Sequence, residues 1–441
     1  MTSSYHLEDR GKCNKNTSAN THNVPKLRFK GYNDEWKHLN LKSITKMIKD
    51  GTHGSYKDLS EGIPLLSAKD IENGKVIISD DCRKISISDY NDIYKNYSLE
   101  IDDILLTIVG TIGRVAIVSD LTNQYAFQRS VGILRANEHN SPNFILYLLQ
   151  TDFIKKQFYS KVNQSAQGGI YLDTLGKIDF KIPAKKEQEK IASFLTLIDK
   201  KIEKQKELVE LLKKYKRGLL SAIFSQKLRF KDDNGNDYPA WEEKSLNNIF
   251  DTVTDFVAAG SFADLRKNVQ YNEKPDFAQL VRTIDLKNNF KNKDFVFVNE
   301  LAFKYLWRVN LSEDALILPN IGANIGEVYY INSFKLPYKH NVLGPNAILL
   351  KSSNNNLYYL YSKCLTDNFR KLLFLQVGAS GQPKFNKTDL KKIKIKISIN
   401  IDEQNKISDF LSKFDDKIQQ EESTLNYLQM YKKGLLQQLF I

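Results

Sequence analysis

The stretch EQEKIASFLTLIDKKIEKQKELVELLKKYKRGLLSAIF at residues 187–224 returns without a gap as EQNKISDFLSKFDDKIQQEESTLNYLQMYKKGLLQQLF at residues 403–440. Of the 38 aligned positions, 16 are identical, which is far more than chance gives. A long repeat at a constant offset is typical of a chain built from similar units in tandem. The sequence therefore predicts a twofold object.

In both copies the apolar positions step by four and three, which places one narrow stripe on one side of a helix. Such a stripe is buried by a second helix, and its natural partner is the other copy. Over 31 residues each helix spans roughly 46 Å, which suits a spacer. The alternative interpretation is a coiled coil that serves only dimerisation or stability. The predicted seam residues are Ile191, Leu195, Ile198, Ile202, Val209, Leu212, Ile407, Leu411, Phe414, Ile418, Leu425 and Leu428.

A second repeat opens each unit. The tetrapeptide KLRF occurs at 26–29 with Trp36 downstream, and again at 227–230 with Trp241 downstream. The second KLRF begins shortly after the first helix copy ends, whereas the C-terminus stops at the equivalent place in the second copy. We expect the N-terminal KLRF to pack beside the C-terminal helix end, which closes a pseudo-twofold arrangement.

The globular stretches repeat more faintly, with apolar β-branched runs on either side of a glycine turn. Two paired strands are predicted in 102–118 and again in 314–331. A helix follows each pair, opened in the first unit by Ser141 and Pro142. A polar glycine-rich loop, 164–174 or 378–389, then leads into an alternating strand and the long helix. This order predicts an α+β fold.

Composition sets outer bounds on function. The chain has 441 residues, 41% of them apolar, and a net charge of +13, which favours a polyanionic partner. Its three cysteines lack the spacing of a disulfide framework or zinc site. The first residues are polar without an apolar core, and the most apolar run, 104–118, is too short to span a bilayer. We expect a soluble, intracellular protein.

The ordered set of paired KLRF openings, glycine turns, glycine-rich loops and two EQ-initiated helices resembles the specificity (S) subunit of Type I restriction-modification enzymes. The resemblance covers the chain from residue 24 onward. It implies two target recognition domains in tandem, separated by two long antiparallel coiled-coil helices in a pseudo-twofold, circular organisation. The implied boundaries are a disordered N-terminal tail at 1–25, target recognition domain 1 at 26–184, spacer helix 1 at 185–225, target recognition domain 2 at 226–400 and spacer helix 2 at 401–441.

What the resemblance implies for function is a cytoplasmic, DNA-associated recognition subunit without catalysis of its own. Such a subunit reads a bipartite, asymmetric double-stranded DNA target and positions two modification (adenine methyltransferase) subunits and the restriction subunits. No cofactor is expected on this chain, because S-adenosylmethionine, ATP and Mg belong on the partners. Two alternatives remain open: the specificity subunit of a methylation-only or fused methyltransferase and nuclease system, and a coiled-coil adaptor that does not bind DNA.

Motifs for catalysis are missing from the sequence. It has no Pro-Pro pair for a methyltransferase loop, no GxxxxGK[ST] motif and no histidine spacing typical of a metal site. Pro275, Asp276, Asp285 and Lys287 loosely match the nuclease pattern PD followed by D-x-K. The repeat explains these residues better, because IDL at 284–286 is the counterpart of KDI at 69–71.

Base edges are read by side chains with paired donors and acceptors, such as Arg, Asn and Gln, while Lys tends to hold phosphates. Loops offer such residues in both halves, although loops are also polar simply because they are solvated. The DNA-binding candidates are Arg114, Gln128, Arg129, Gln164, Gln167, Tyr171, Asn320, Asn324, Lys339, Asn341, Gln382 and Lys384. Lys392, Lys394 and Lys396 are predicted to share one strand face, where we favour protection of an edge over a phosphate contact.

Overall fold

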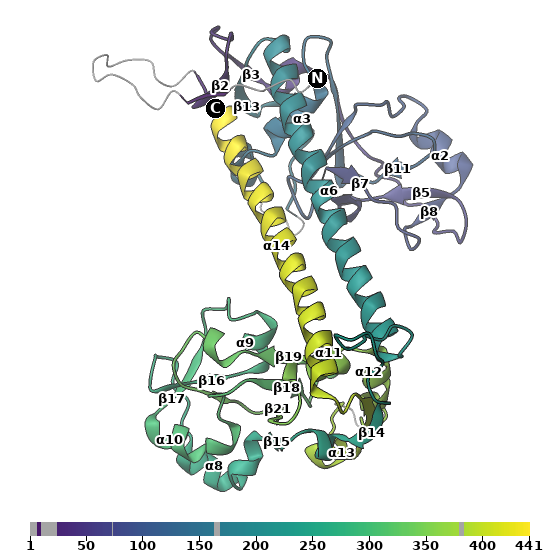
Figure 1. Cartoon of the computed structure of the whole chain (residues 1–441). Helices are drawn as coiled ribbons and strands as arrows, with labels where there is room; N and C mark the ends of the chain where they lie inside the picture. Colours follow the sequence, from purple (N-terminus) through teal and green to yellow (C-terminus); the bar gives the residue numbers. More distant parts are fainter. Residues whose placement is uncertain (1–6, 10–23, 73, 163–167, 379–382) are drawn as a thin grey trace. The chain divides into compact units, whose positions relative to one another are not determined.

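A computed structural model describes residues 7–9, 24–72, 74–162, 168–378 and 383–441. The chain divides into two compact units: unit 1 combines residues 1–206 with 423–441, and unit 2 comprises residues 207–422. Two long helices, α6 (Lys185–Phe224) and α14 (Ile401–Leu439), each contribute one part to either unit. Each unit is thus an α+β globular part with an antiparallel pair of helix segments, as the repeat predicts (Figure 1).

Unit 1 is built on a four-stranded antiparallel sheet in the order β10-β9-β12-β4. A three-stranded sheet, β11-β5-β8, and small two-stranded sheets complete it. The strands are β1 (Leu7–Asp9), β2 (Leu27–Phe29), β3 (Lys37–Asn40), β4 (Thr45–Asp50), β5 (Ile63–Leu66), β6 (Ile71–Glu72), β7 (Lys75–Val76), β8 (Lys84–Ile85), β9 (Ile104–Thr107), β10 (Val115–Ile117), β11 (Ala126–Phe127), β12 (Val131–Ala136) and β13 (Asp179–Ile182).

Unit 2 repeats this plan with β15-β21-β18-β19 and β17-β16-β20. The predicted hairpins are confirmed, since β9 pairs with β10 and β18 with β19, both antiparallel. The strands are β14 (Glu242–Ser245), β15 (Thr252–Asp255), β16 (Ala278–Val281), β17 (Val296–Val298), β18 (Ala315–Pro319), β19 (Tyr329–Ile331), β20 (Asn341–Leu343), β21 (Ala347–Lys351) and β22 (Lys394–Ile397).

Short helices connect the strands, and α3 and α11 pack on the four-stranded sheets. Those of unit 1 are α1 (Leu41–Ile44), α2 (Ile87–Ile93), α3 (Pro142–Leu149), α4 (Asp152–Ser160), α5 (Leu172–Gly176) and the 3-10 turn η1 (Ala68–Asp70). Those of unit 2 are α7 (Leu246–Ile249), α8 (Phe262–Asn268), α9 (Thr283–Lys287), α10 (Glu300–Tyr305), α11 (Leu357–Cys364), α12 (Asp367–Phe374), α13 (Lys387–Lys392), η2 (Phe256–Ala259), η3 (Trp307–Val309) and η4 (Ser333–Lys335).

The structure differs from the sequence expectation at three places. The single helix expected after each hairpin is a pair, α3 with α4 and α11 with α12, because Thr151 and Thr366 have extended backbone between the two helices. Their hydroxyls bond carbonyls three residues back, 2.7 and 2.8 Å away. Part of the tail expected to be disordered forms β1, which pairs with β2. Lys392 ends α13, so only Lys394 and Lys396 share the exposed face of β22.

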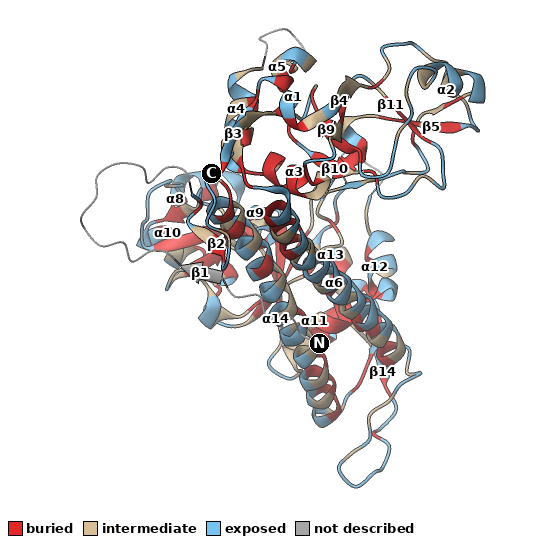
Figure 2. Ribbon diagram, turned by 90° about the horizontal axis from the view of Figure 1, so that it is seen from above, coloured by how far each residue is buried: buried red, intermediate tan, exposed pale blue. Residues whose placement is uncertain are grey.

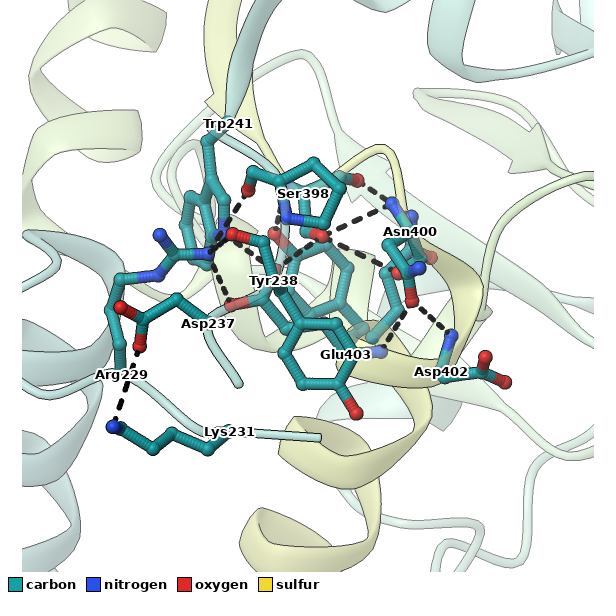
Figure 3. A network of polar contacts seen from close by, with 12 residues as sticks. Arg229, Lys231, Asp237, Tyr238, Trp241, Ser398, Asn400, Asp402 and Glu403 are labelled. Carbon is teal, nitrogen blue, oxygen red and sulfur yellow. Dashed lines mark hydrogen bonds and ion pairs between the residues drawn. The ribbon is translucent and has the colours of Figure 1, made fainter. Parts of the chain in front are cut away.

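Each long helix begins with a glutamate that is buried in the fold. Glu187 receives two hydrogen bonds of 2.8 Å from the guanidinium of Arg28, and both side chains are at most 3% exposed. In unit 2 Arg229 pairs with Glu403 at 3.1 Å. Figure 3 shows that Glu403 also accepts from Trp241 Nε1 at 2.9 Å. The arginine of each KLRF thus neutralises a carboxylate that would otherwise be buried as a lone charge.

The glutamine that follows each glutamate joins the long helix to the short helix beside it. Gln188 accepts from the backbone N–H of Ser141 at 2.9 Å and donates to Asn140, just before α3. Gln404 accepts from the N–H of Asn356 at 2.8 Å and donates to Asn355, just before α11. The repeated letters EQ therefore encode a repeated structural joint.

The helix segments pack together in both units. In unit 1, Ile191 and Leu195 of α6 share a buried cluster with Leu435 and Leu439 of α14. Phe29 of the first KLRF lies in the same cluster, as predicted for a closed arrangement. In unit 2, Leu220 and Ile223 of α6 share a cluster with Ile407 and Leu411. Figure 2 shows α3, which completes the unit 1 cluster, buried along most of its length.

None of the predicted seam residues is exposed. Seven are buried and five are partly buried, because a two-helix seam is covered on fewer sides than a globular core. The buried ones are Ile191, Leu195, Val209, Ile407, Leu411, Ile418 and Leu428, and the partly buried ones are Ile198, Ile202, Leu212, Phe414 and Leu425.

A lysine and an aspartate link the two helices in each unit. Lys432 of α14 lies 2.7 Å from Asp199 of α6, and Tyr147 donates to the same carboxylate at 2.9 Å. In unit 2 Lys216 of α6 pairs with Asp415 of α14, to which Tyr358 also donates. Both lysines stand at equivalent positions in the YKK and YKR endings of the repeat, so the contact is reciprocal.

We predict that Glu187→Gln lowers the free energy of unfolding of unit 1 by about 3–5 kcal/mol, because Arg28 is left buried without a counter-charge. Urea unfolding with hydrogen exchange measures the loss and assigns it to unit 1. Glu189→Gln removes the same charge from an exposed position two residues away and should change stability by less than about 0.5 kcal/mol. Equal stability of the two variants would contradict the role of the pair.

A second prediction concerns the stability that the buried seam residues contribute. Leu195→Ala removes a side chain with 0% exposure and should cost about 2–5 kcal/mol in unfolding free energy. Leu211→Ala, at a position 63% exposed on the same helix, should cost under about 0.5 kcal/mol. Leu212→Ala should fall between them. Thermal unfolding measures the stability of the three variants. If the loss did not decrease in the order Leu195→Ala, Leu212→Ala, Leu211→Ala, the proposed packing of the helices would be wrong.

Candidate nucleic-acid interface

Two loops meet in unit 1 at the end of the β9–β10 hairpin. The turn is shaped by Gly110 and Gly113, whose φ angles of 77° and 89° disfavour residues with a Cβ. Val109 forms a bridge with Gly169, and the N–H of Ile170 bonds the carbonyl of Ile108 at 2.9 Å. The glycine-rich loop is therefore hydrogen-bonded to the hairpin turn.

Unit 2 repeats this junction with different side chains. Gly322 and Gly326 shape the turn with φ angles of 88° and 94°. Ile321 forms a bridge with Lys384, and the N–H of Gly322 bonds the carbonyl of Pro383 at 3.0 Å. Both units thus present a glycine turn and a polar loop together, although the two segments are far apart in sequence.

The structure brings several unit 1 candidates to this junction. Arg114 follows the turn and is exposed, and Tyr171, also exposed, precedes α5. Gln128 and Arg129 lie just before β12, one strand away, where the N–H of Ile108 bonds Ser130. Gln164 and Gln167 lie outside the described residues.

In unit 2, Asn320, Asn324 and Lys384 are brought together. The amide of Asn320 donates to the carbonyl of Phe385 at 3.0 Å and so helps to hold the junction. Lys339 and Asn341 lie instead at the start of β20, in the three-stranded sheet. Asn341 is 4% exposed, and its amide donates to the carbonyl of Tyr338, so it does not present a free amide to a base edge. Gln382 lies outside the described residues.

Sequence reasoning missed a charged group at the second turn. Lys287 donates to Asn324 Oδ1 at 3.0 Å and lies 3.8 Å from Glu327. Tyr329 also donates to Glu327, and burial together with that carboxylate raises the pKa of the tyrosine. Aligning the two glycine turns would have revealed that Arg114 and Glu327 occupy the same position.

An open cavity of about 430 Å³ adjoins the second junction. Its walls are mainly apolar and include Phe256, Phe262, Tyr271, Asn320 and Ile321. The cavity therefore lies at the protein surface, next to the glycine turn of unit 2.

The nuclease-like pattern has a structural explanation. Asp285 is fully buried, and its carboxylate accepts from Arg282 at 2.9 Å and from Asn292 at 2.7 Å. Its counterpart Asp70 is also buried and accepts from the N–H of Ser67 at 2.7 Å. Both aspartates stabilise the first turn of a short helical segment, so the repeat accounts for them.

Across the described ranges there is no group of three or more His, Cys, Asp or Glu side chains placed to bind a metal ion. Among the helices that the structure describes, none has the length and apolar character of a membrane span.

The tandem arrangement and the paired junctions match a known family. The sequence pattern of the "Type I restriction modification DNA specificity domain" fits twice, over residues 33–213 and 222–430. The chain belongs to this family. Its two units are tandem target recognition domains of a DNA-binding specificity subunit, and such subunits act in recognition.

Relatives match along most of the chain. The putative Type I restriction enzyme MjaX specificity subunit of Methanocaldococcus jannaschii is 24% identical over 419 residues, which cover 91% of this chain and 92% of the relative. The MjaIX specificity subunit of the same organism is 26% identical over 342 residues, 74% of each chain.

Two solved structures share the fold. The S subunit of the Type I restriction-modification system from M. genitalium has a TM-score of 0.55 at 16% identity and covers 95% of this chain and 99% of its own. A chain solved to explain complex assembly and conformational transition of the type I R-M system has a TM-score of 0.50 at 15% identity, with 91% and 96% covered.

We predict that Asp285→Asn lowers the free energy of unfolding of unit 2 by about 1.5–3 kcal/mol, because Arg282 loses a charged hydrogen-bond partner. Asp276→Asn, at the exposed partner position of the nuclease pattern, should change stability by less than about 0.5 kcal/mol, because its hydrogen bonds with Asn272 and Phe277 lie at the surface. Thermal unfolding measures both. If neither variant changed stability and both abolished Mg-dependent DNA cleavage by the purified chain, the structural role would be wrong.

Proposed function

We propose that this specificity subunit reads a bipartite, asymmetric DNA target, with one half-site for each unit. The observation that supports this most strongly is that one junction occurs twice with unlike residues. Unit 1 presents Arg114 and Tyr171 beside its glycine turn, and unit 2 presents Asn324, Glu327 and Lys384 beside its own. Because donors and acceptors on side chains distinguish base edges in the major groove, different residues in one frame select different bases.

The basic character of the chain supports DNA as the ligand. Its net charge of +13 favours attraction to phosphates, which contributes affinity without sequence preference. Specificity then depends on the few side chains at the two junctions.

The long helices offer surfaces for partner subunits. Large apolar side chains stand exposed on them at equivalent positions, Tyr215 and Leu211 in unit 2 and Tyr431 and Tyr427 in unit 1. Exposed apolar and aromatic residues of this kind are typical of protein interfaces. We infer one modification subunit for each unit, with restriction subunits joining the complex, and with S-adenosylmethionine, ATP and Mg bound by the partners. This chain then takes no part in the chemistry itself.

Co-expression with the modification subunits tests the proposal. Adenine methylation mapped across host DNA should give a split motif with unlike halves, because the two junctions differ. A palindromic motif would contradict asymmetric reading. An assembled complex that leaves host DNA unmethylated would instead favour the coiled-coil adaptor. A parallel cleavage assay on unmodified DNA separates a restriction system from a methylation-only one.

A further inference from the structure

The turn of unit 1 holds Arg114 in a rigid frame. Thr107, which is fully buried, accepts a hydrogen bond from the N–H of Arg114 through its hydroxyl at 2.9 Å. The backbone N–H of Thr107 donates to the carbonyl of Arg114 at 2.9 Å, and the carbonyl of Thr107 accepts from the N–H of Gly113 at 2.9 Å. The Thr107 hydroxyl also donates to the carbonyl of Thr111. One buried residue therefore fixes the backbone from 111 to 114.

The side chain of Arg114 is available for a ligand. It is exposed, and among the described residues no carboxylate pairs with its guanidinium. Two other unit 1 arginines differ in this respect, since Arg28 is bound to Glu187 and Arg135 to Asp103. A third, Arg83, donates to the carbonyl of Tyr56. An arginine held by its backbone and free at its tip is suited to contact a ligand.

The equivalent position in unit 2 carries the opposite charge. Gly113-Arg114-Val115 aligns with Gly326-Glu327-Val328, and Asp70-Ile71-Glu72 aligns with Asp285-Leu286-Lys287. Unit 1 thus has arginine on the turn and glutamate at Glu72 on β6, which packs beside β10. Unit 2 has glutamate on the turn and Lys287 on α9, and these two lie 3.8 Å apart. The signs of charge at these two aligned positions are thus opposite in the two units.

We propose that this turn position determines specificity in unit 1, where Arg114 reads a guanine in the first half-site. The inference rests on the proposed DNA-reading function. A guanidinium presents two parallel donors that match N7 and O6 of guanine, whereas a carboxylate only accepts and suits the amino group of cytosine or adenine. The two units therefore cannot use this position to read the same base. Thr107 is a positioning residue that orients Arg114.

The test uses the full chain in complex with the modification subunits and measures methylation rates on DNA substituted at each target position. Arg114→Ala should reduce discrimination at one G·C pair of one half-site by about 5-fold to 150-fold and leave the other half-site unchanged. Lys95→Ala removes the same charge from an exposed site after α2 and should preserve discrimination everywhere. Unchanged melting temperatures of both variants show that the fold is intact.

Two further variants sharpen the result. Thr107→Val should reduce discrimination at the same G·C pair as Arg114→Ala. A purely structural effect would instead reduce discrimination across the whole half-site. Glu327→Ala should leave that pair untouched. The assignment would be overturned if Arg114→Ala reduced discrimination at an A·T pair, or if it kept full discrimination at every position.

The failure of the inference is distinguishable from the failure of the proposed function. If the wild-type complex assembles and methylates no DNA, the proposed function itself is wrong. If the wild type methylates a split target and Arg114→Ala keeps its selectivity, only the inference is wrong.

Discussion

A buried carboxylate at the start of each long helix is the constraint on which both units depend. Glu187 and Glu403 lie where an unpaired charge would be strongly destabilising, so each requires the arginine of its own KLRF segment. The ion pair holds the KLRF segment against the first turn of the long helix. The adjacent glutamine holds the start of α3 or α11 against that turn. Because these contacts are charged and directional, they specify one arrangement where apolar packing alone would tolerate several.

This division of roles explains how one fold serves two readers. The joint, the sheet and the glycine turn are nearly the same in both units, whereas the side chains at the tip of the turn are not. Thr107 clamps the turn of unit 1, while Pro319 stands at the equivalent position of unit 2 and the Lys287–Glu327 pair braces that turn instead. Each turn is thus held by different contacts, while the chemistry presented to a ligand changes.

The repeat made much of the fold predictable. Heptad spacing indicated the helices and their seam, and β-branched runs around glycines indicated both hairpins. The split of α3 from α4 was not predicted, because the apolar helical pattern continues past Thr151, whose extended backbone separates the two helices. At the site, the glycine turns were visible, but the burial of Asn341 and the contact of Lys287 with Glu327 depend on strand pairing between distant segments. The domain boundaries proposed from sequence stay a prediction.

The central claim is that the two units are equivalent frames that differ only in what they read. It is tested most directly by a chain in which the globular segments 26–184 and 226–400 change places while the long helices stay, followed by methylation mapping with the modification subunits. Equivalent frames predict that the same two half-sites are recognised and that the methylated motif is unchanged. A different motif, in a complex shown to assemble, would contradict the equivalence of the units.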